Sequence, residues 1–202
     1  MIRGSAMSCG TSCRERILDA AERIVLRRGA VHMTMDAIAA QAGVSKGGLI
    51  YHFPSQHALL RALLQRFVER VNERRLRILR RLPPKPTRSL RAYLLAWLGM
   101  GRREQRSAAA LLATSTREPE LVAAVRQRHQ KVWAELLAGI PQPERAMILA
   151  LAVEGMWMSE LLGVSPLTVR QRTRLRAALL RLAEEWPLAG RRPTHRRRKA
   201  ST

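Results

Sequence analysis

Apolar residues recur at the spacing of one helix face along most of this 202-residue chain. The first such segment places five of them at i, i+3, i+4, i+7 and i+8: Ile17, Ala20, Ala21, Ile24 and Val25. No stretch alternates apolar and polar residues with a period of two, as a half-buried strand would. The sequence therefore predicts an all-α fold with about nine helices.

Capping residues and helix breakers divide this pattern into segments. Four hydroxyl residues can cap the first four helices: Ser12, Thr34, Ser45 and Ser55. Three breakers end the first three: Gly29, Gly43 and Pro54. The fourth helix runs for about 27 residues, roughly 40 Å, to a proline cluster at 83–86. Later patterns cover 89–100, 103–115, 119–140, 143–163 and 166–186, with Pro143 and Pro166 expected in first turns.

The chain is strongly basic, with 37 Lys and Arg against 15 Asp and Glu and a formal net charge of +22. Such an excess points first to a polyanionic partner. It is spread along the chain, however, so charge alone does not locate a site. No run of 18 apolar residues is present, which argues against a membrane-spanning segment. Cys9 and Cys13 are too few for a disulfide framework or a four-ligand zinc site, so we expect a reducing cytoplasm and no metal.

Residues 34–53 have the layout of a helix-turn-helix. The small Ala39 lets the second helix approach the first, and Gly43 makes the turn. Three apolar residues fill the wedge between the helices: Ile38, Val44 and Leu49. This arrangement is typical of proteins that place the second helix in the major groove of DNA.

Residues 14–64 resemble the N-terminal DNA-binding domain of the TetR family of bacterial transcriptional regulators. The matching stretches include Arg28-Gly29, Ala42-Gly43-Val44-Ser45-Lys46-Gly47 and Tyr51-His52-Phe53-Pro54-Ser55. The resemblance implies a helix-turn-helix domain over 12–58 and an effector-binding and dimerisation domain over 59–188. A basic, disordered tail is expected over 189–202. The family often has an aromatic residue at Ile50 and a Lys-Glu pair at Gln56-His57, so this chain differs at those positions.

Seven residues are the candidate DNA contacts: Thr34, Ser45, Lys46, Gly47, Gly48, Tyr51 and His52. The three hydroxyls suit phosphate oxygens, and the two glycines permit close approach of the backbone to DNA. Lys46 and Tyr51 are the best candidates for reading bases. The alternatives are that the serine and threonine act only as helix caps and that His52 is a packed histidine.

Five large apolar residues are candidates for an effector cavity, which the resemblance implies: Trp97, Met100, Trp133, Met156 and Trp157. Such side chains suit an apolar or aromatic small molecule, although ordinary core packing is the alternative for each. The resemblance also implies a dimer interface of paired helices, for which six residues are candidates: Gly155, Ser159, Leu175, Leu179, Leu182 and Trp186. The alternative there is packing within the chain.

Seven arginines of the predicted fourth helix could form a second basic surface: Arg66, Arg70, Arg74, Arg75, Arg77, Arg80 and Arg81. Glu69 and Glu73 interleave with them as i,i+4 partners, which favours a solvated face over a second basic surface. The Arg196-Arg197-Arg198-Lys199 run is either a solubilising tail or a source of nonspecific DNA affinity.

Together with the resemblance, these patterns favour a dimeric, sequence-specific regulator that binds a palindromic site on double-stranded DNA, most simply a repressor that a small molecule releases. The alternative is a basic, architectural protein that coats nucleic acid without specificity. A third hypothesis is an orphan regulator whose second half only dimerises. We expect no enzyme activity and no cofactor, because no glycine-rich phosphate loop, nucleophile elbow or His-Glu-x-x-His motif is present.

Overall fold

A computed structural model describes residues 12–29, 32–115, 119–140 and 142–185. Within these residues the chain forms α-helices and no strand, which confirms the all-α prediction. The nine helices are α1 (Cys13–Arg28), α2 (Met35–Ala42), α3 (Lys46–His52), α4 (Gln56–Arg81), α5 (Arg88–Leu98), α6 (Arg102–Ser115), α7 (Pro119–Leu137), α8 (Pro143–Leu161) and α9 (Val169–Glu184). None of these helices combines the length and the apolar character needed to span a membrane. The basic tail and Trp186 lie outside the described residues.

The four predicted N-terminal caps are confirmed. The hydroxyl oxygens of Ser12, Thr34, Ser45 and Ser55 each accept a hydrogen bond from the backbone N–H three residues later, at 3.3, 3.2, 3.0 and 3.1 Å respectively. Each bond satisfies an N–H group that the helix itself leaves without a partner. The short connections between the first four helices therefore follow from local chemistry.

Helix α9 begins later than the sequence predicted. Pro166 is not in its first turn, because the helix starts at Val169 and Thr168 caps it. The Gln171 side chain accepts from the Thr168 N–H at 2.8 Å, while the Thr168 hydroxyl accepts from the Gln171 N–H at 3.3 Å. This reciprocal capping box satisfies two backbone groups, so it outweighs the proline as a start signal. Pro143, in contrast, does occupy the first turn of α8.

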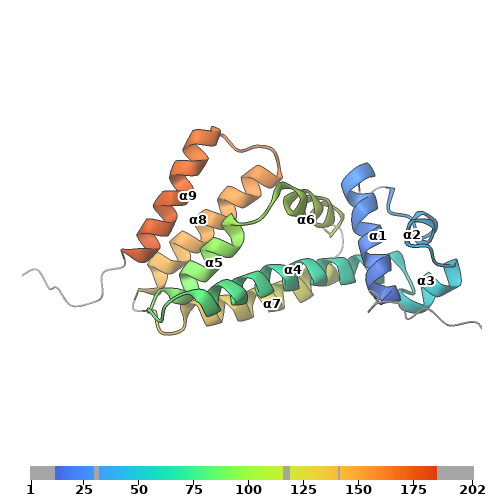
Figure 1. Cartoon of the computed structure of the whole chain (residues 1–202), viewed down its shortest axis with the longest axis horizontal. Coiled ribbons are helices and arrows are strands. Elements are labelled where there is room, and N and C mark those ends of the chain that lie inside the picture. The colour runs from blue at the N-terminus through green and yellow to red at the C-terminus, as the bar shows by residue number, and fades with distance from the viewer. Residues whose placement is uncertain (1–11, 30–31, 116–118, 141, 186–202) are drawn as a thin grey trace, which may run out of the picture.

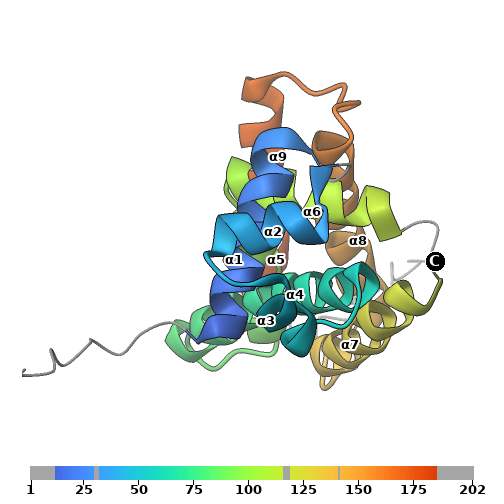
Figure 2. The same ribbon diagram turned by 90° about the vertical axis from the view of Figure 1, so that its right-hand side faces the viewer.

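The first three helices pack with the start of α4 around one apolar core. Ile38 and Leu49 of the predicted wedge are fully buried there, and Val44 packs against them. Gly43 adopts the left-handed conformation, with φ 65°, that a turn between two helices requires. Figure 2 shows α2 and α3 together at one end of the molecule, in front of the remaining helices.

Helix α4 runs from this unit along the rest of the molecule, with α7 beside it (Figure 1). Its first turns supply Leu59, Leu60, Leu63 and Leu64 to the N-terminal core. Helices α5, α7, α8 and α9 supply a second core, in which α5, α8 and α9 pack together around residues such as Leu94. The domain boundary expected at residues 58 and 59 thus falls within a continuous helix.

The expectation of a solvated arginine face on α4 is wrong for Arg66, Arg74 and Arg75, which are buried or half-buried, and the exposed Arg70 also pairs with another helix. The Arg66 side chain is only 9% exposed and contacts Glu15, Asp19 and Glu22 of α1 at 3.2, 2.7 and 2.9 Å. Burial would lower the pKa of Arg66, but these carboxylates outweigh it and raise the pKa.

The other three also pair with neighbouring helices. Arg70 binds Glu22 of α1 at 2.8 Å, Arg74 pairs with Glu104 of α6, and Arg75 binds Glu135 of α7 at 2.6 Å. The i,i+4 argument failed because helices pack against α4 on several sides. Arg70 is exposed despite its ion pair, and the three arginines nearest the C-terminus of α4 also conform to the expectation: Arg77, Arg80 and Arg81.

We expect R66M to destabilise the protein by about 2 kcal/mol, because it leaves a cluster of carboxylates without their shared counter-charge. In a chain of this size that loss lowers the melting temperature by roughly 4–8 °C. R77M is the matched control, since Arg77 is exposed on the same helix. Thermal unfolding followed by circular dichroism measures both. Equal melting temperatures for the two variants would contradict a structural role for the Arg66 cluster.

Candidate nucleic-acid interface and internal cavity

The candidate DNA contacts lie on the exposed side of α2 and α3. The Tyr51 side chain is 86% exposed, and Thr34, Ser45, Lys46 and Gly47 are exposed as well. Lys46 Nζ lies 2.9 Å from Asp36 Oδ1, an ion pair between the first turns of α3 and α2. The structure thus places the starts of both helices side by side.

Two of the candidates are explained in part by local structure. Gly48 is half-buried, and a Cβ atom there would lie 3.2 Å from the Ser45 hydroxyl oxygen, so its lack of a side chain leaves room for the cap. His52 is half-buried and makes an edge contact with Tyr51, with 5.3 Å between the ring centroids. Gly47 has open space around it, so its backbone is accessible to a partner.

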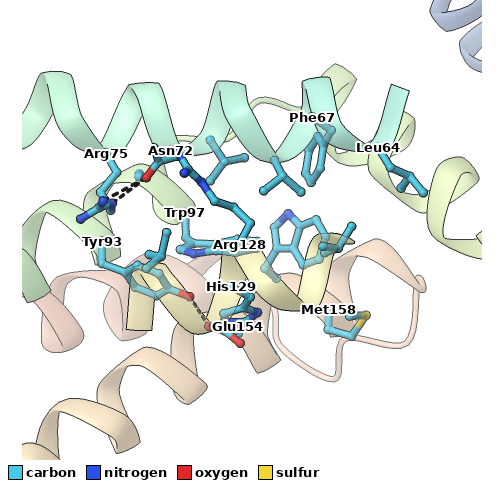
Figure 3. Close-up of a pocket in the computed structure, with 16 residues that line it drawn as sticks. Leu64, Phe67, Asn72, Arg75, Tyr93, Trp97, Arg128, His129, Glu154 and Met158 are labelled. Atoms are coloured by element: carbon cyan, nitrogen blue, oxygen red, sulfur yellow. Dashed lines mark hydrogen bonds and ion pairs between the residues drawn. The ribbon is translucent and has the colours of Figure 1, made fainter. Parts of the chain in front are cut away.

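A cavity of about 210 Å³ lies in the second half of the molecule, with walls from α4, α5, α7 and α8 (Figure 3). Trp97 and Trp157 line it, as the sequence suggested, and their rings meet edge to face at 4.9 Å. Phe67 of α4 stacks on Trp157 at 6.4 Å between centroids. Most of the lining is therefore aromatic or aliphatic.

The other three cavity candidates are not among the lining residues. Met156 is buried in the second core, and Met100 is buried in a small cluster with Trp157. Trp133 is half-buried and donates its indole N–H to Glu154 at 3.3 Å. Sequence spacing identified these residues as buried or half-buried but did not show which of them face the cavity.

Glu154 is the cavity residue with the densest set of partners. Its carboxylate accepts hydrogen bonds from the Tyr93 hydroxyl and the Trp133 indole and lies 3.4 Å from His129 Nε2. Burial would raise the pKa of Glu154, but the bonds from His129, Tyr93 and Trp133 outweigh it and lower the pKa. Burial and the neighbouring carboxylate raise the pKa of Tyr93 far above its ordinary value.

The opposite end of the cavity carries guanidinium groups (Figure 3). Arg75 donates two hydrogen bonds to the Asn72 side-chain oxygen, at 3.1 and 3.0 Å, and pairs with Glu135. The Nε of Arg128 is buried without a hydrogen-bond partner among the described residues. Sequence reasoning missed Arg75 and Arg128 as lining residues. Their position follows only from how α7 packs on α4.

The candidate dimer residues divide between the interior and the surface. Leu179 is buried in the second core of the chain, and Leu175 is half-buried against that core. Gly155 and Leu182 are exposed, and the half-buried Ser159 donates its hydroxyl to the Met156 carbonyl at 2.9 Å. Four further apolar residues of α8 or its C-terminal end are also exposed: Ile148, Leu151, Met158 and Leu162.

The structure is that of a helix-turn-helix protein in which one continuous helix joins the helix-turn-helix to a domain with an internal aromatic cavity. Residues 17–63 match the family model for "Bacterial regulatory proteins, tetR family". Residues 87–184 match that for "Tetracyclin repressor-like, C-terminal domain". The chain belongs to the TetR family of transcriptional regulators.

Individual relatives agree with this assignment. The "Uncharacterized HTH-type transcriptional regulator TtgW" of Pseudomonas putida is 39% identical over 51 residues, which span 25% of this chain and 38% of that protein. The multidrug binding protein EbrR complexed with ethidium is 28% identical, with a TM-score of 0.61 over 85% of this chain and 98% of its own. A TetR-family member from Streptomyces coelicolor A3 is 27% identical, with a TM-score of 0.63 over 85% and 98% of the two chains.

We expect Y93F to destabilise the protein at neutral pH by about 1–2 kcal/mol, because the Glu154 carboxylate loses a hydroxyl donor. Because the pKa of Glu154 is lowered in the folded state, its ionised carboxylate stabilises the fold at pH values above the ordinary pKa of a glutamate. This stabilisation is lost as the pH falls through the lowered pKa. The difference between wild type and Y93F should therefore shrink in acid.

Urea unfolding between about pH 7 and about pH 3.5 measures this difference. Y51F is the matched control, since Tyr51 is exposed and we expect little change in stability. A pH-independent loss in Y93F would mean that packing, rather than the charge of Glu154, accounts for it.

Proposed function

We propose that the protein is a dimeric, sequence-specific DNA-binding repressor that a small aromatic molecule releases from a palindromic operator. The observation that carries this proposal is that α4 contributes both to the core behind the helix-turn-helix and to the wall of the cavity. A protein with this function acts on DNA in the cytoplasm and needs no cofactor.

Recognition of DNA is assigned to the exposed side of α2 and α3. Tyr51 and Lys46 extend from α3, while Thr34 and Ser45 can combine capping with phosphate contact. Lys46 is paired with Asp36 at 2.9 Å in the free protein, and both side chains are largely exposed. Because such a pair is weak in water, Lys46 can exchange the carboxylate for a DNA phosphate at little cost.

Dimerisation is assigned to α8 and α9. Leu151 is 57% exposed, and it shares α8 with the exposed Ile148 and Gly155. Positions 148, 151, 155 and 162 recur at helical spacing, so they form an apolar stripe on one face. A second copy of the chain would bury this stripe. Two copies would also present the paired recognition helices that a palindromic site requires.

Release by an effector follows from the position of the cavity. Leu64 and Phe67 line the cavity and also pack in or against the core of the helix-turn-helix unit. A ligand that separates Phe67 from Trp157 would shift α4 and, with it, the spacing of two recognition helices. Only a difference in ligand affinity between the two conformations is needed for this effect.

The nonspecific alternative would use the net charge of +22 as a DNA-coating surface. The ion pairs favour the specific regulator instead. Arg66, Arg70, Arg74 and Arg75 all pair with carboxylates on other helices. Much of the positive charge on α4 is therefore already neutralised within the chain.

The proposal is tested by selecting binding sites from a random pool of duplex DNA at about 150 mM salt, where weak electrostatic binding is screened. Enrichment of a palindrome is the expected result, and it would also provide the operator. Retention of bulk DNA without enrichment would favour the nonspecific binder, since specific regulators exceed nonspecific affinity by about 10³ or more.

We expect S45A to lower affinity for the selected operator by about tenfold relative to S55A, because only Ser45 lies on the DNA-facing side. Both serines cap a helix with one backbone hydrogen bond, so both substitutions should cost about 1 kcal/mol of stability. Fluorescence anisotropy with labelled operator measures the difference. Equal affinities would mean that Ser45 acts only as a cap.

We expect V71W to abolish ethidium binding, because Val71 lines the cavity and tryptophan fills it. Ethidium is the probe because EbrR was crystallised with it. Isothermal titration calorimetry is done without DNA, since ethidium intercalates. Ethidium binding by V71W at wild-type affinity would place the ligand site outside this cavity.

A further inference from the structure

A groove of about 490 Å³ between α1 and α6 is lined almost entirely by arginine. Its walls are formed by Arg23, Leu26, Arg27, Arg102, Arg103 and Arg106. Arg23 is half-buried, and the other four arginines are exposed. The groove is separate from the aromatic cavity, which shares none of these residues.

These five guanidinium groups have no ion-pair partner within the described part of the chain. The Nε of Arg23 is also buried without a hydrogen-bond partner among those residues. Carboxylates do lie in the adjoining hollow, but each is already engaged. Glu22 and Asp19 bind Arg66, and Glu104 binds Arg74 and the Gly101 N–H.

Like charges gathered in one groove repel one another, and an anion that binds between them relieves this repulsion. Guanidinium groups also match phosphate oxygens with paired N–H donors. A single phosphate carries at most about two negative charges at neutral pH. Five guanidinium groups therefore suit a ligand with several phosphates better than one with a single phosphate.

We propose that the groove between α1 and α6 binds a soluble anion with two or more phosphate groups. The position of the groove favours a free anion over the DNA backbone. Figure 1 shows α6 on the side of α1 opposite α2 and α3, and Figure 2 shows α2 in front of α6. DNA held by α3 would thus lie on the far side of α1 from the groove.

Such an anion would tie α1, which packs in the helix-turn-helix core, to α6 of the second half. Arg23 and Arg27 belong to α1, whereas Arg102, Arg103 and Arg106 belong to the first turns of α6. The bound anion would therefore hold the two helices together through phosphate bridges. The inference does not depend on the operator, the effector or the dimer proposed above.

Isothermal titration calorimetry of the full chain with inorganic tripolyphosphate, at about 150 mM salt, tests the proposal. We expect saturable binding that R102Q/R106Q weakens at least about tenfold, because each arginine supplies charge-assisted hydrogen bonds. R27Q, on the opposite wall, should weaken binding as well. R77Q/R80Q is the matched control, since it removes two exposed arginines of α4 and should leave the affinity unchanged.

Three results would overturn the proposal: no binding to the wild type, wild-type affinity in R102Q/R106Q, or an equal loss in R77Q/R80Q. A parallel titration with a duplex lacking any operator identifies the other source of phosphate. If R102Q/R106Q weakens duplex binding while tripolyphosphate does not bind, the groove contacts DNA, and the free-anion proposal is wrong. Circular dichroism of each variant shows whether the fold is intact.

Discussion

The structure depends on one continuous helix, α4, that belongs to both halves of the molecule. Its first turns place Leu59 and Leu63 in the core of the helix-turn-helix unit, and its later turns place Asn72 and Arg75 in the cavity wall. A helix transmits displacement because its backbone hydrogen bonds keep successive turns in register. Any movement of the cavity wall at α4 therefore reaches the surface that carries α2 and α3.

Two adjacent residues of α4 fix where this helix meets its neighbours. Arg66 binds three carboxylates of α1, which sets the angle between α1 and α4. Phe67 stacks on Trp157 of α8 and also packs against the N-terminal core. The ion pairs of Arg66 thus hold α4 against α1, and the stacked ring of Phe67 holds α4 against α8. A ligand that enters beside Phe67 would perturb the second contact while the first remains intact.

Features set by local chemistry could be predicted from the sequence, whereas features set by packing between helices could not. The caps at Ser45 and Thr34 need only a hydroxyl and a nearby backbone N–H. The partners of Arg66, in contrast, lie 44 to 51 residues away in α1, beyond the reach of an i,i+4 argument. The cavity shows the same limit, since Trp97 faces it and Trp133 does not. The choice depends on how α5, α7 and α8 pack together.

The charge of the chain shows why composition is a poor guide to DNA affinity. Salt dependence reports only the cations that lie against phosphate, not the total. Arg66 and Arg75 are buried and hold helices together, so they do not reach DNA. Lys46 is exposed beside the recognition surface, although it is a single residue. The number of counterions released on DNA binding should therefore follow the few cations near α2 and α3, and it should be far smaller than the net charge of +22 suggests.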